Sequence, residues 1–128
     1  MKPMRIEIIE DDAILSKVLR DELGAAGYEI ISSYDGEDGE KVAAFEQPDL
    51  ILLDLLLPKK HGFEVLTALK ASPTTRNIPT IILTVLGQDE DIKRGMQLGA
   101  SDYFVKSQHS IGEIVDGVKK FLEKNAAV

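Results

Sequence analysis

A run of apolar residues from Leu50 to Pro58 contains one charged residue, Asp54. A run this apolar is typical of a strand that is buried on both faces of a parallel sheet. An ionised Asp inside such a strand would be strongly unfavourable unless another group compensated its charge. We therefore expect the strand to end at Asp54, at the sheet edge where open parallel sheets bind ligands. The alternative is that Asp54 simply begins a turn before Pro58.

Short apolar runs alternate with amphipathic segments along the whole chain. The expected strands are 5–10, 28–33, 50–54, 80–84 and 102–105, and the expected helices are 15–23, 36–45, 63–69, 89–98 and 111–122. Five strands that alternate with five helices indicate right-handed crossovers and an α/β fold. We therefore predict a doubly wound, five-stranded parallel sheet with helices on both faces.

The size and composition of the chain limit its organisation and its partners. With 44% hydrophobic residues, the 128 residues suit a single domain over 1–128, with a core of about 5–122 and a frayed tail at 123–128. No apolar run is long enough to cross a membrane, and the absence of Cys fits a cytoplasmic protein. The net charge of −7 argues against direct binding to nucleic acid.

Four of the expected strands end in polar residues. Glu10, Asp11 and Asp12 follow the first strand, Asp54 ends the third, Thr84 ends the fourth and Lys106 follows the fifth. Most have an ordinary explanation taken alone: Glu10 and Asp11 suit loop acids, Asp12 a helix N-cap, Thr84 a strand residue and Lys106 a solvated charge. The carboxyl ends of parallel strands meet at one edge of the sheet, so we expect the whole set to lie together.

Clustered carboxylates at this edge would repel one another and raise each other's pKa. A hard divalent cation relieves this repulsion, and oxygen ligands without Cys or a His pair favour Mg²⁺ over zinc. A carboxylate nucleophile beside Mg²⁺, a hydroxyl and an ammonium group is an arrangement for phosphoryl transfer. In it, Lys106 and the cation neutralise charge on the phosphoryl oxygens while Asp54 attacks in line.

The ordered set of motifs resembles a response-regulator receiver domain, the CheY-like phosphoacceptor module of two-component signalling. The resemblance covers about residues 5–122. The matching residues are Ile9–Asp12, Pro48–Leu50, Asp54, Pro58, Gly62, Ile78–Pro79, Thr84, Gly99–Tyr103 and Lys106. The resemblance implies a flavodoxin-like three-layer sandwich with strand order 2-1-3-4-5.

The resemblance also implies which residues bind the phosphoryl group. Asp54 would be the phosphoacceptor, and Lys106 would pair with the phosphoryl group. Thr84 would form a hydrogen bond to that group, and Tyr103 would move inward as Thr84 is drawn toward it. Thr84 and Tyr103 would therefore carry the conformational switch.

A magnesium site is implied by the same resemblance. Asp11 and Asp54 would ligate Mg²⁺ directly, together with the backbone carbonyl of Leu56, and Glu10 would act through a water molecule. These ligands would place the cation beside the attacking carboxylate.

The function implied by the resemblance is that of a phosphorelay receiver. A sensor histidine kinase or a histidine phosphotransfer protein would donate the phosphoryl group to Asp54. The surface formed by 89–98, 102–105 and 111–122 would then control a protein partner, and two copies would pair through it if the receiver dimerises. The chain would catalyse only its own phosphorylation and dephosphorylation, so we do not class it as an enzyme. Both a stand-alone regulator and a receiver cut from a longer chain fit the sequence.

The chain departs from the usual pattern of the family at several positions. Ser107 follows Lys106 where receivers usually carry a cis-Pro, and a cis bond before a non-proline residue costs about 2.5–4 kcal/mol, so we predict a trans peptide. Val85 replaces a commonly small residue and would narrow the approach to Asp54. Leu56 and Leu86 would flank the phosphoryl site, where neither side chain can activate water. We therefore expect slow self-hydrolysis of the aspartyl phosphate.

Two other classes of function compete with this interpretation. A Mg²⁺-dependent aspartyl phosphatase usually has a second acid two residues after its nucleophile, and here that position is Leu56. A receiver-like module that switches by protein contact alone would explain the departures at Val85 and Ser107. In the loop at 59–61, we interpret Lys59, Lys60 and His61 as solvated side chains.

Overall fold

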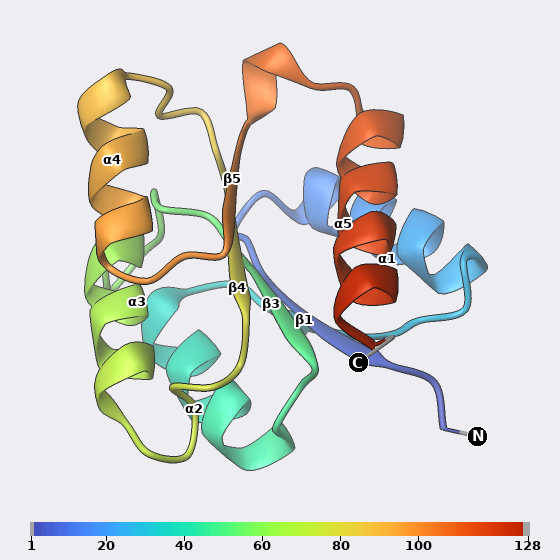
Figure 1. The fold of residues 1–128 in the computed structure, drawn as a ribbon, viewed down its shortest axis with the longest axis horizontal. Coiled ribbons are helices and arrows are strands. Elements are labelled where there is room, and N and C mark those ends of the chain that lie inside the picture. Colours follow the sequence, from blue (N-terminus) through green and yellow to red (C-terminus); the bar gives the residue numbers. More distant parts are fainter. Residues whose placement is uncertain (1, 127–128) are drawn as a thin grey trace.

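The computed structural model describes residues 2–126. The strands are β1 (Arg5–Ile9), β2 (Glu29–Ser33), β3 (Leu50–Leu53), β4 (Thr80–Thr84) and β5 (Asp102–Val105). The helices are α1 (Ala13–Ala25), α2 (Gly36–Glu46), α3 (Gly62–Ala71), α4 (Asp89–Gln97) and α5 (Ile111–Ala126). All the expected elements are present in the expected order (Figure 1).

The bounds of most elements differ from the sequence-based prediction by one or two residues, and the differences in β1, β3 and α5 matter most here. Strands β1 and β3 end one residue early, at Ile9 and Leu53, so Glu10 and Asp54 both lie just beyond the sheet. Helix α5 continues to Ala126, past Leu122, the last residue of the core cluster on this helix. Residues 123–126 are therefore helical rather than a frayed tail, and residues 1 and 127–128 lie outside the described residues.

The five strands form one parallel sheet with the order β2-β1-β3-β4-β5, which confirms the predicted topology. From β1 the chain first moves to β2 and then returns past β1 to β3. The connections on the two sides of β1 therefore diverge, and a crevice opens at the carboxyl ends of β1 and β3. The backbone register pairs Ile9 with Leu53, so these two strands end side by side.

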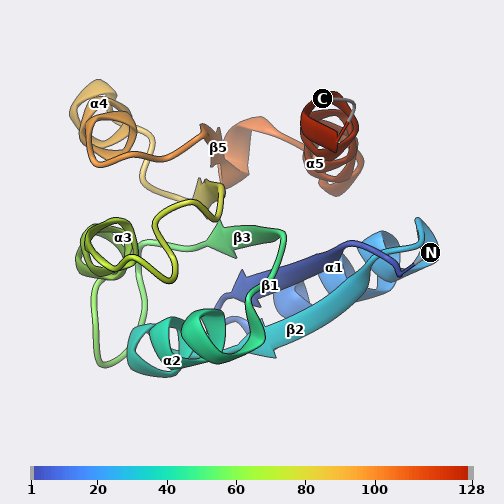
Figure 2. The same cartoon turned by 60° about the horizontal axis from the view of Figure 1, so that its bottom comes forward.

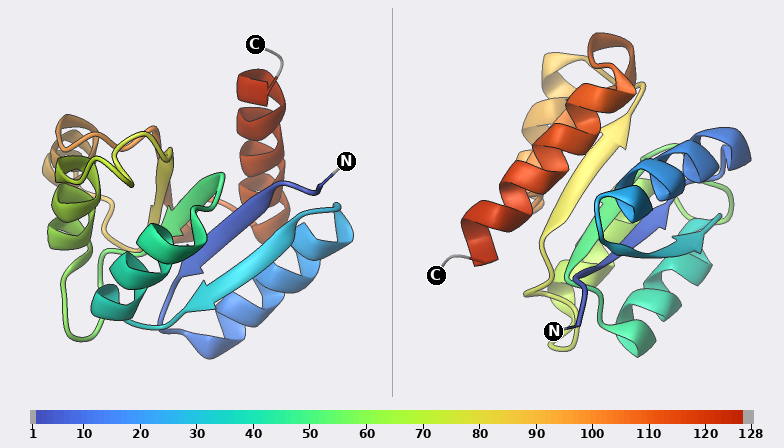
Figure 3. Two further views of the ribbon diagram at one scale, coloured as in Figure 1. Left: turned by 90° about the horizontal axis from the view of Figure 1, so that it is seen from below. Right: turned by 90° about the vertical axis from the view of Figure 1, so that its right-hand side faces the viewer.

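Helices cover both faces of the sheet. Helices α1 and α5 lie on one face and α2, α3 and α4 on the other (Figures 2 and 3). Alternate strand residues supply the two cores: Ile8 and Leu52 pack toward α1 and α5, whereas Ile9 and Leu53 pack toward α2 and α3. Strand β3 is buried along its whole length, as its apolar sequence predicts. None of the helices within residues 2–126 has the length and apolar character to cross a membrane.

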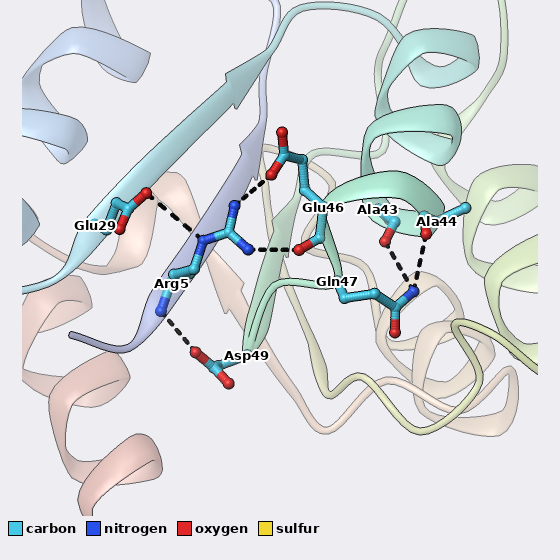
Figure 4. A network of polar contacts seen from close by, with 7 residues as sticks. All are labelled: Arg5, Glu29, Ala43, Ala44, Glu46, Gln47 and Asp49. Atoms are coloured by element: carbon cyan, nitrogen blue, oxygen red, sulfur yellow. Dashed lines mark hydrogen bonds and ion pairs between the residues drawn. The ribbon is translucent and has the colours of Figure 1, made fainter. Parts of the chain in front are cut away.

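A network of polar contacts around Arg5 connects several elements at the amino ends of the strands, the end of the sheet away from the crevice (Figure 4). The guanidinium group donates to the backbone oxygen and the carboxylate of Glu46 and lies 3.6 Å from the carboxylate of Glu29. The backbone N–H of Arg5 donates to Asp49 at 2.7 Å. One residue thus connects β1 with β2, the end of α2 and the start of β3.

Candidate functional site

Three carboxylates meet in the crevice between β1 and β3. Glu10 and Asp11 follow β1, and the backbone N–H of Asp54 donates to the carbonyl of Ile9 at 3.0 Å, which fixes where the chain leaves β3. One carboxylate oxygen from each of Glu10, Asp11 and Asp54 lies within 4.8 Å of the other two. Glu10 and Asp54 are buried, with 2% and 5% of their surfaces exposed, whereas Asp11 is exposed. The structure therefore brings together the acids that the sequence placed at two strand ends.

Lys106 joins this cluster from the end of β5. Its Nζ lies 2.6 Å from Glu10 Oε1 and 3.1 Å from Asp54 Oδ2. The peptide between Lys106 and Ser107 is trans, as predicted. A 3₁₀ turn at Lys106–Gln108 follows β5 directly, and the ammonium group reaches the acids although Ser107 replaces the usual proline.

The pKa values of Glu10 and Lys106 are set by their burial and by the charges of their neighbours in the cluster. Burial raises the pKa of Glu10 to about 7; the Lys106 ammonium opposes this shift and the Asp54 charge adds to it. Burial lowers the pKa of Lys106, but the hydrogen bonds and charges of Glu10 and Asp54 outweigh it, so this pKa is raised overall. The ammonium group is therefore a permanent positive charge beside Asp54.

A hard divalent cation fits this donor set. Oxygen ligands at about 2.1 Å from an octahedral Mg²⁺ lie about 3–4 Å apart, and the three carboxylate oxygens here lie within 4.8 Å of one another. Three acids face a single ammonium group here, so their charge is not balanced by the protein side chains described. Within residues 2–126, this is the one group of three acidic or histidine side chains compact enough to hold a metal ion.

Thr84 ends β4, and its side chain is fully buried. Its hydroxyl has no hydrogen-bond partner among the described residues. An unpaired buried hydroxyl costs about 1–3 kcal/mol, so it is available to a ligand that can accept a hydrogen bond. The structure thus leaves free the hydroxyl that the sequence singled out.

Tyr103 on β5 connects three elements near the site. Its hydroxyl donates to the backbone oxygen of Leu86 at 2.5 Å, in the segment between β4 and α4. Burial raises the pKa of Tyr103 to about 12, and the charges of Asp91 and Asp54 add to the shift, so the hydroxyl remains a donor. The ring packs beneath α4 at Gly95, where an added Cβ would lie 2.7 Å from Ile82 Cδ1 and 3.2 Å from two atoms of the Tyr103 ring.

Replacing Gly95 with Val should therefore displace α4 from Ile82 and from the Tyr103 ring. We expect the free energy of unfolding to fall by about 1–3 kcal/mol, as in other overpacked cores. The matched control is Gly24→Val in α1, where an added Cβ has no neighbour within 4 Å. Urea denaturation of both variants checks this prediction, and equal stabilities would contradict the close packing of α4 at Gly95 against Ile82 and Tyr103.

Side chains of the loop before α3 make polar contacts with α2 and with α3. Nδ1 of His61 accepts the backbone N–H of Phe63 at 3.1 Å, so His61 is the N-cap of α3. Lys59 lies 3.6 Å from Asp35, and Lys60 pairs with Glu40. Lys59 is exposed, as interpreted from the sequence, whereas Lys60 and His61 are partly buried and have close partners, so the interpretation of those two side chains as solvated was wrong. The partners of the two lysines lie in α2 or at its N-cap, and the partner of His61 lies in α3. The sequence of the loop alone does not reveal these contacts.

The fold and the site define a doubly wound α/β domain with an acid cluster and a lysine at its switch point. The sequence profile described as the response regulator receiver domain matches residues 6–124. The chain therefore belongs to the response regulator receiver domain family of two-component systems.

Three comparisons illustrate this membership. The chain is 40% identical over 120 residues to RpaA of Synechocystis, a DNA-binding dual master transcriptional regulator; the match covers 94% of this chain and 49% of RpaA. The Mn²⁺-bound form of the response regulator Rcp1 aligns with a TM-score of 0.81 and 31% identity, covering 93% of this chain and 94% of Rcp1. The phosphorylated cyanobacterial phytochrome response regulator RcpA aligns with a TM-score of 0.78 and 30% identity, covering 94% of this chain and 92% of RcpA. The chain spans about half the length of the first curated relatives that it matches.

Proposed function

We propose that Asp54 accepts a phosphoryl group from the phosphohistidine of a sensor histidine kinase or a histidine phosphotransfer protein, in the cytoplasm. The observation that carries this proposal is the contact of Lys106 Nζ with Asp54 inside a cluster of three carboxylates. A buried carboxylate beside a permanent cation and a cation-sized acid cluster is suited to receiving a phosphoryl group, whose three oxygens carry negative charge.

The resting contacts of Asp54 orient its carboxylate for attack. Oδ1 accepts the backbone N–H of Leu56 at 3.3 Å, and Oδ2 accepts the Lys106 ammonium. One carboxylate oxygen forms a bond to phosphorus as the bond from phosphorus to the histidine nitrogen breaks, and that nitrogen keeps the electron pair. The Lys106 ammonium group would then donate to a phosphoryl oxygen instead of to the Asp54 carboxylate.

Mg²⁺ would supply further positive charge to the transferring phosphoryl group when it is bound. In the proposed site Asp11, Asp54 and the backbone carbonyl of Leu56 hold the ion, and Glu10 acts through a water molecule. The compact carboxylate cluster supports this assignment.

The unpaired hydroxyl of Thr84 would donate to the new phosphoryl group and couple the site to Tyr103. Tyr103 already holds the Leu86 carbonyl and contacts α4, so a shift of Thr84 would be transmitted to the α4–β5–α5 surface. We propose that this surface controls a protein partner and is also where two copies would pair.

Incubation with a small phosphodonor and Mg²⁺, followed by intact mass measurement, tests the proposal against its two rivals. We expect stable addition of one phosphoryl group, which depends on Mg²⁺. Repeated turnover of phosphate would favour an aspartyl phosphatase instead. No addition, even with a cognate kinase, would favour a module that switches by protein contact.

The apolar rim of the site should slow hydrolysis of the aspartyl phosphate. Leu56 and Val85 are roughly half exposed, and Leu86 is partly exposed at the same edge. None of these side chains can orient a water molecule, so Leu86→Glu should accelerate dephosphorylation at least about tenfold. The Tyr103 contact uses the backbone of residue 86 and is retained.

The control for this rate measurement is Met96→Glu, which adds the same charge at an exposed position on α4. Phosphate release is followed after removal of the phosphodonor. Equal rates for wild type and Leu86→Glu would contradict the role of the apolar rim.

A further inference from the structure

The loop between β3 and α3 contains a strained three-residue turn. The backbone N–H of Lys60 donates to the carbonyl of Pro58 at 2.7 Å, and Lys59 between them has a φ of 68°. A turn of this γ type with positive φ is rare and strained for a residue with a side chain. Such conformations persist where surrounding contacts over-determine them.

The backbone of this turn lies directly against the first residue of α2. The N–H of Gly36 donates to the carbonyl of Pro58 at 3.2 Å. A Cβ on Gly36 would lie only 2.3 Å from the carbonyl oxygen of Lys60, so this close approach requires glycine. The loop passes the start of α2 on its way to α3 (Figure 2). Any change of the turn therefore changes the surroundings of Gly36.

Two ion pairs reinforce the same junction. Lys60 pairs with Glu40 of α2, and both side chains are partly buried. Lys59 lies 3.6 Å from Asp35, whose carboxylate caps α2 by accepting the N–H of Asp38 at 2.7 Å. The turn is thus fixed to the first two turns of α2 through its backbone and through both lysines.

The other end of the loop is fixed to the phosphoacceptor. The N–H of Leu56 donates to Asp54 Oδ1 at 3.3 Å. The N–H of Gly62 donates to the carbonyl of Leu55 at 2.8 Å, and a Cβ on Gly62 would lie 2.5 Å from the carbonyl oxygen of Asp54. Because both ends are held, a displacement of Leu56 passes to the turn at Pro58.

We propose that this turn couples Asp54 to the start of α2, so that α2 responds to phosphorylation as a second surface besides α4–β5–α5. The inference rests on the proposed function. Phosphorylation replaces the Oδ1 contact of Leu56 and draws its carbonyl toward the cation. The pull moves Pro58 away from Gly36, relaxes Lys59 and opens the first turn of α2.

Residue-resolved hydrogen exchange on the full chain tests this coupling, with beryllofluoride and Mg²⁺ as a mimic of the phosphoryl group. A coupling free energy of the usual allosteric size corresponds to about a fivefold change, so the amides of Gly36 and the first turn of α2 should exchange about fivefold faster. The amides of α4 report the response of the proposed switch surface in the same experiment.

Two variants distinguish coupling of Asp54 to α2 from a general increase in the flexibility of the domain. Lys59→Gly permits the positive φ without strain, and Lys60→Met removes the pair with Glu40; each should lose most of the α2 response and keep that of α4. The control, Lys41→Met, removes an exposed pair with Glu37 on α2 and should keep both responses.

An unchanged α2 in wild type, with a responding α4, would overturn the coupling and leave the proposed function intact. An α2 response of wild-type size in both Lys59→Gly and Lys60→Met would overturn it as well. Failure of beryllofluoride to bind would overturn the proposed function and this inference with it.

Discussion

Asp54→Asn is expected to abolish stable phosphorylation while the domain stays folded. The substitution removes the attacking oxygen and keeps the shape of the side chain. Lys106 retains its shorter contact with Glu10 at 2.6 Å, so the ammonium group is not left unpaired in the protein interior. Loss of one charge from three clustered acids also relieves repulsion, and stability should not fall. Intact mass after incubation with a phosphodonor and Mg²⁺ measures the first effect, and urea denaturation measures the second.

The matched control is Asp116→Asn, which removes a carboxylate from an exposed position on α5. This variant should take up one phosphoryl group as wild type does. Addition to Asp54→Asn at the wild-type rate would contradict the assignment of the phosphoacceptor.

Glu7→Gln is expected to remove much of the pH dependence of stability between about pH 5 and 8. Glu7 lies in the middle of β1 and is fully buried. The hydroxyl of Ser33 donates to its Oε2 at 2.8 Å, and Oε1 has no partner among the described residues. Burial raises the pKa of Glu7 to about 8; the Ser33 hydrogen bond opposes the shift, and the charge of Asp38 on α2 adds to it.

The direction of this pH dependence follows from the number of protons that the folded and the unfolded states bind. The folded protein keeps a proton on Glu7 that the unfolded chain releases near pH 4.5. Its contribution to stability is therefore complete below that pH and is lost as the pH rises toward 8, on the order of 5 kcal/mol in total. Glutamine cannot ionise, so the variant should gain stability relative to wild type as the pH rises.

Urea denaturation at pH 5, 6.5 and 8 checks this prediction. Glu10, whose pKa is also raised, contributes a slope of the same sign to both proteins, so the difference between wild type and variant isolates Glu7. Glu37→Gln, at an exposed position on α2, is the control and should run parallel to wild type. Parallel curves for wild type and Glu7→Gln would contradict a protonated, buried Glu7.

The fold was predictable because its signals are local and repeated. The apolar run at 50–53 is typical of a strand buried on both faces, and five short strand-like runs alternate with amphipathic segments. The convergence of Glu10, Asp11, Asp54 and Lys106 was also predictable, since the carboxyl ends of parallel strands must meet at one edge.

Contacts between distant segments were not predictable in the same way. The closer approach of Lys106 to Glu10 than to Asp54 depends on where the chain turns after β5. A single Glu among isoleucines at Glu7 gives no sign that Ser33 and α2 will enclose it. The pair of Lys60 with Glu40 likewise depends on tertiary packing of the loop against α2.

The most direct test of the account is to locate the phosphoryl group. The phosphorylated chain is reduced with borohydride, which converts an aspartyl phosphate to homoserine, and the modified residue is then identified by peptide mass spectrometry. We predict modification at Asp54 alone, and only in samples that received both the phosphodonor and Mg²⁺. Modification at another carboxylate, or at Asp54 without any divalent cation, would contradict the central claim.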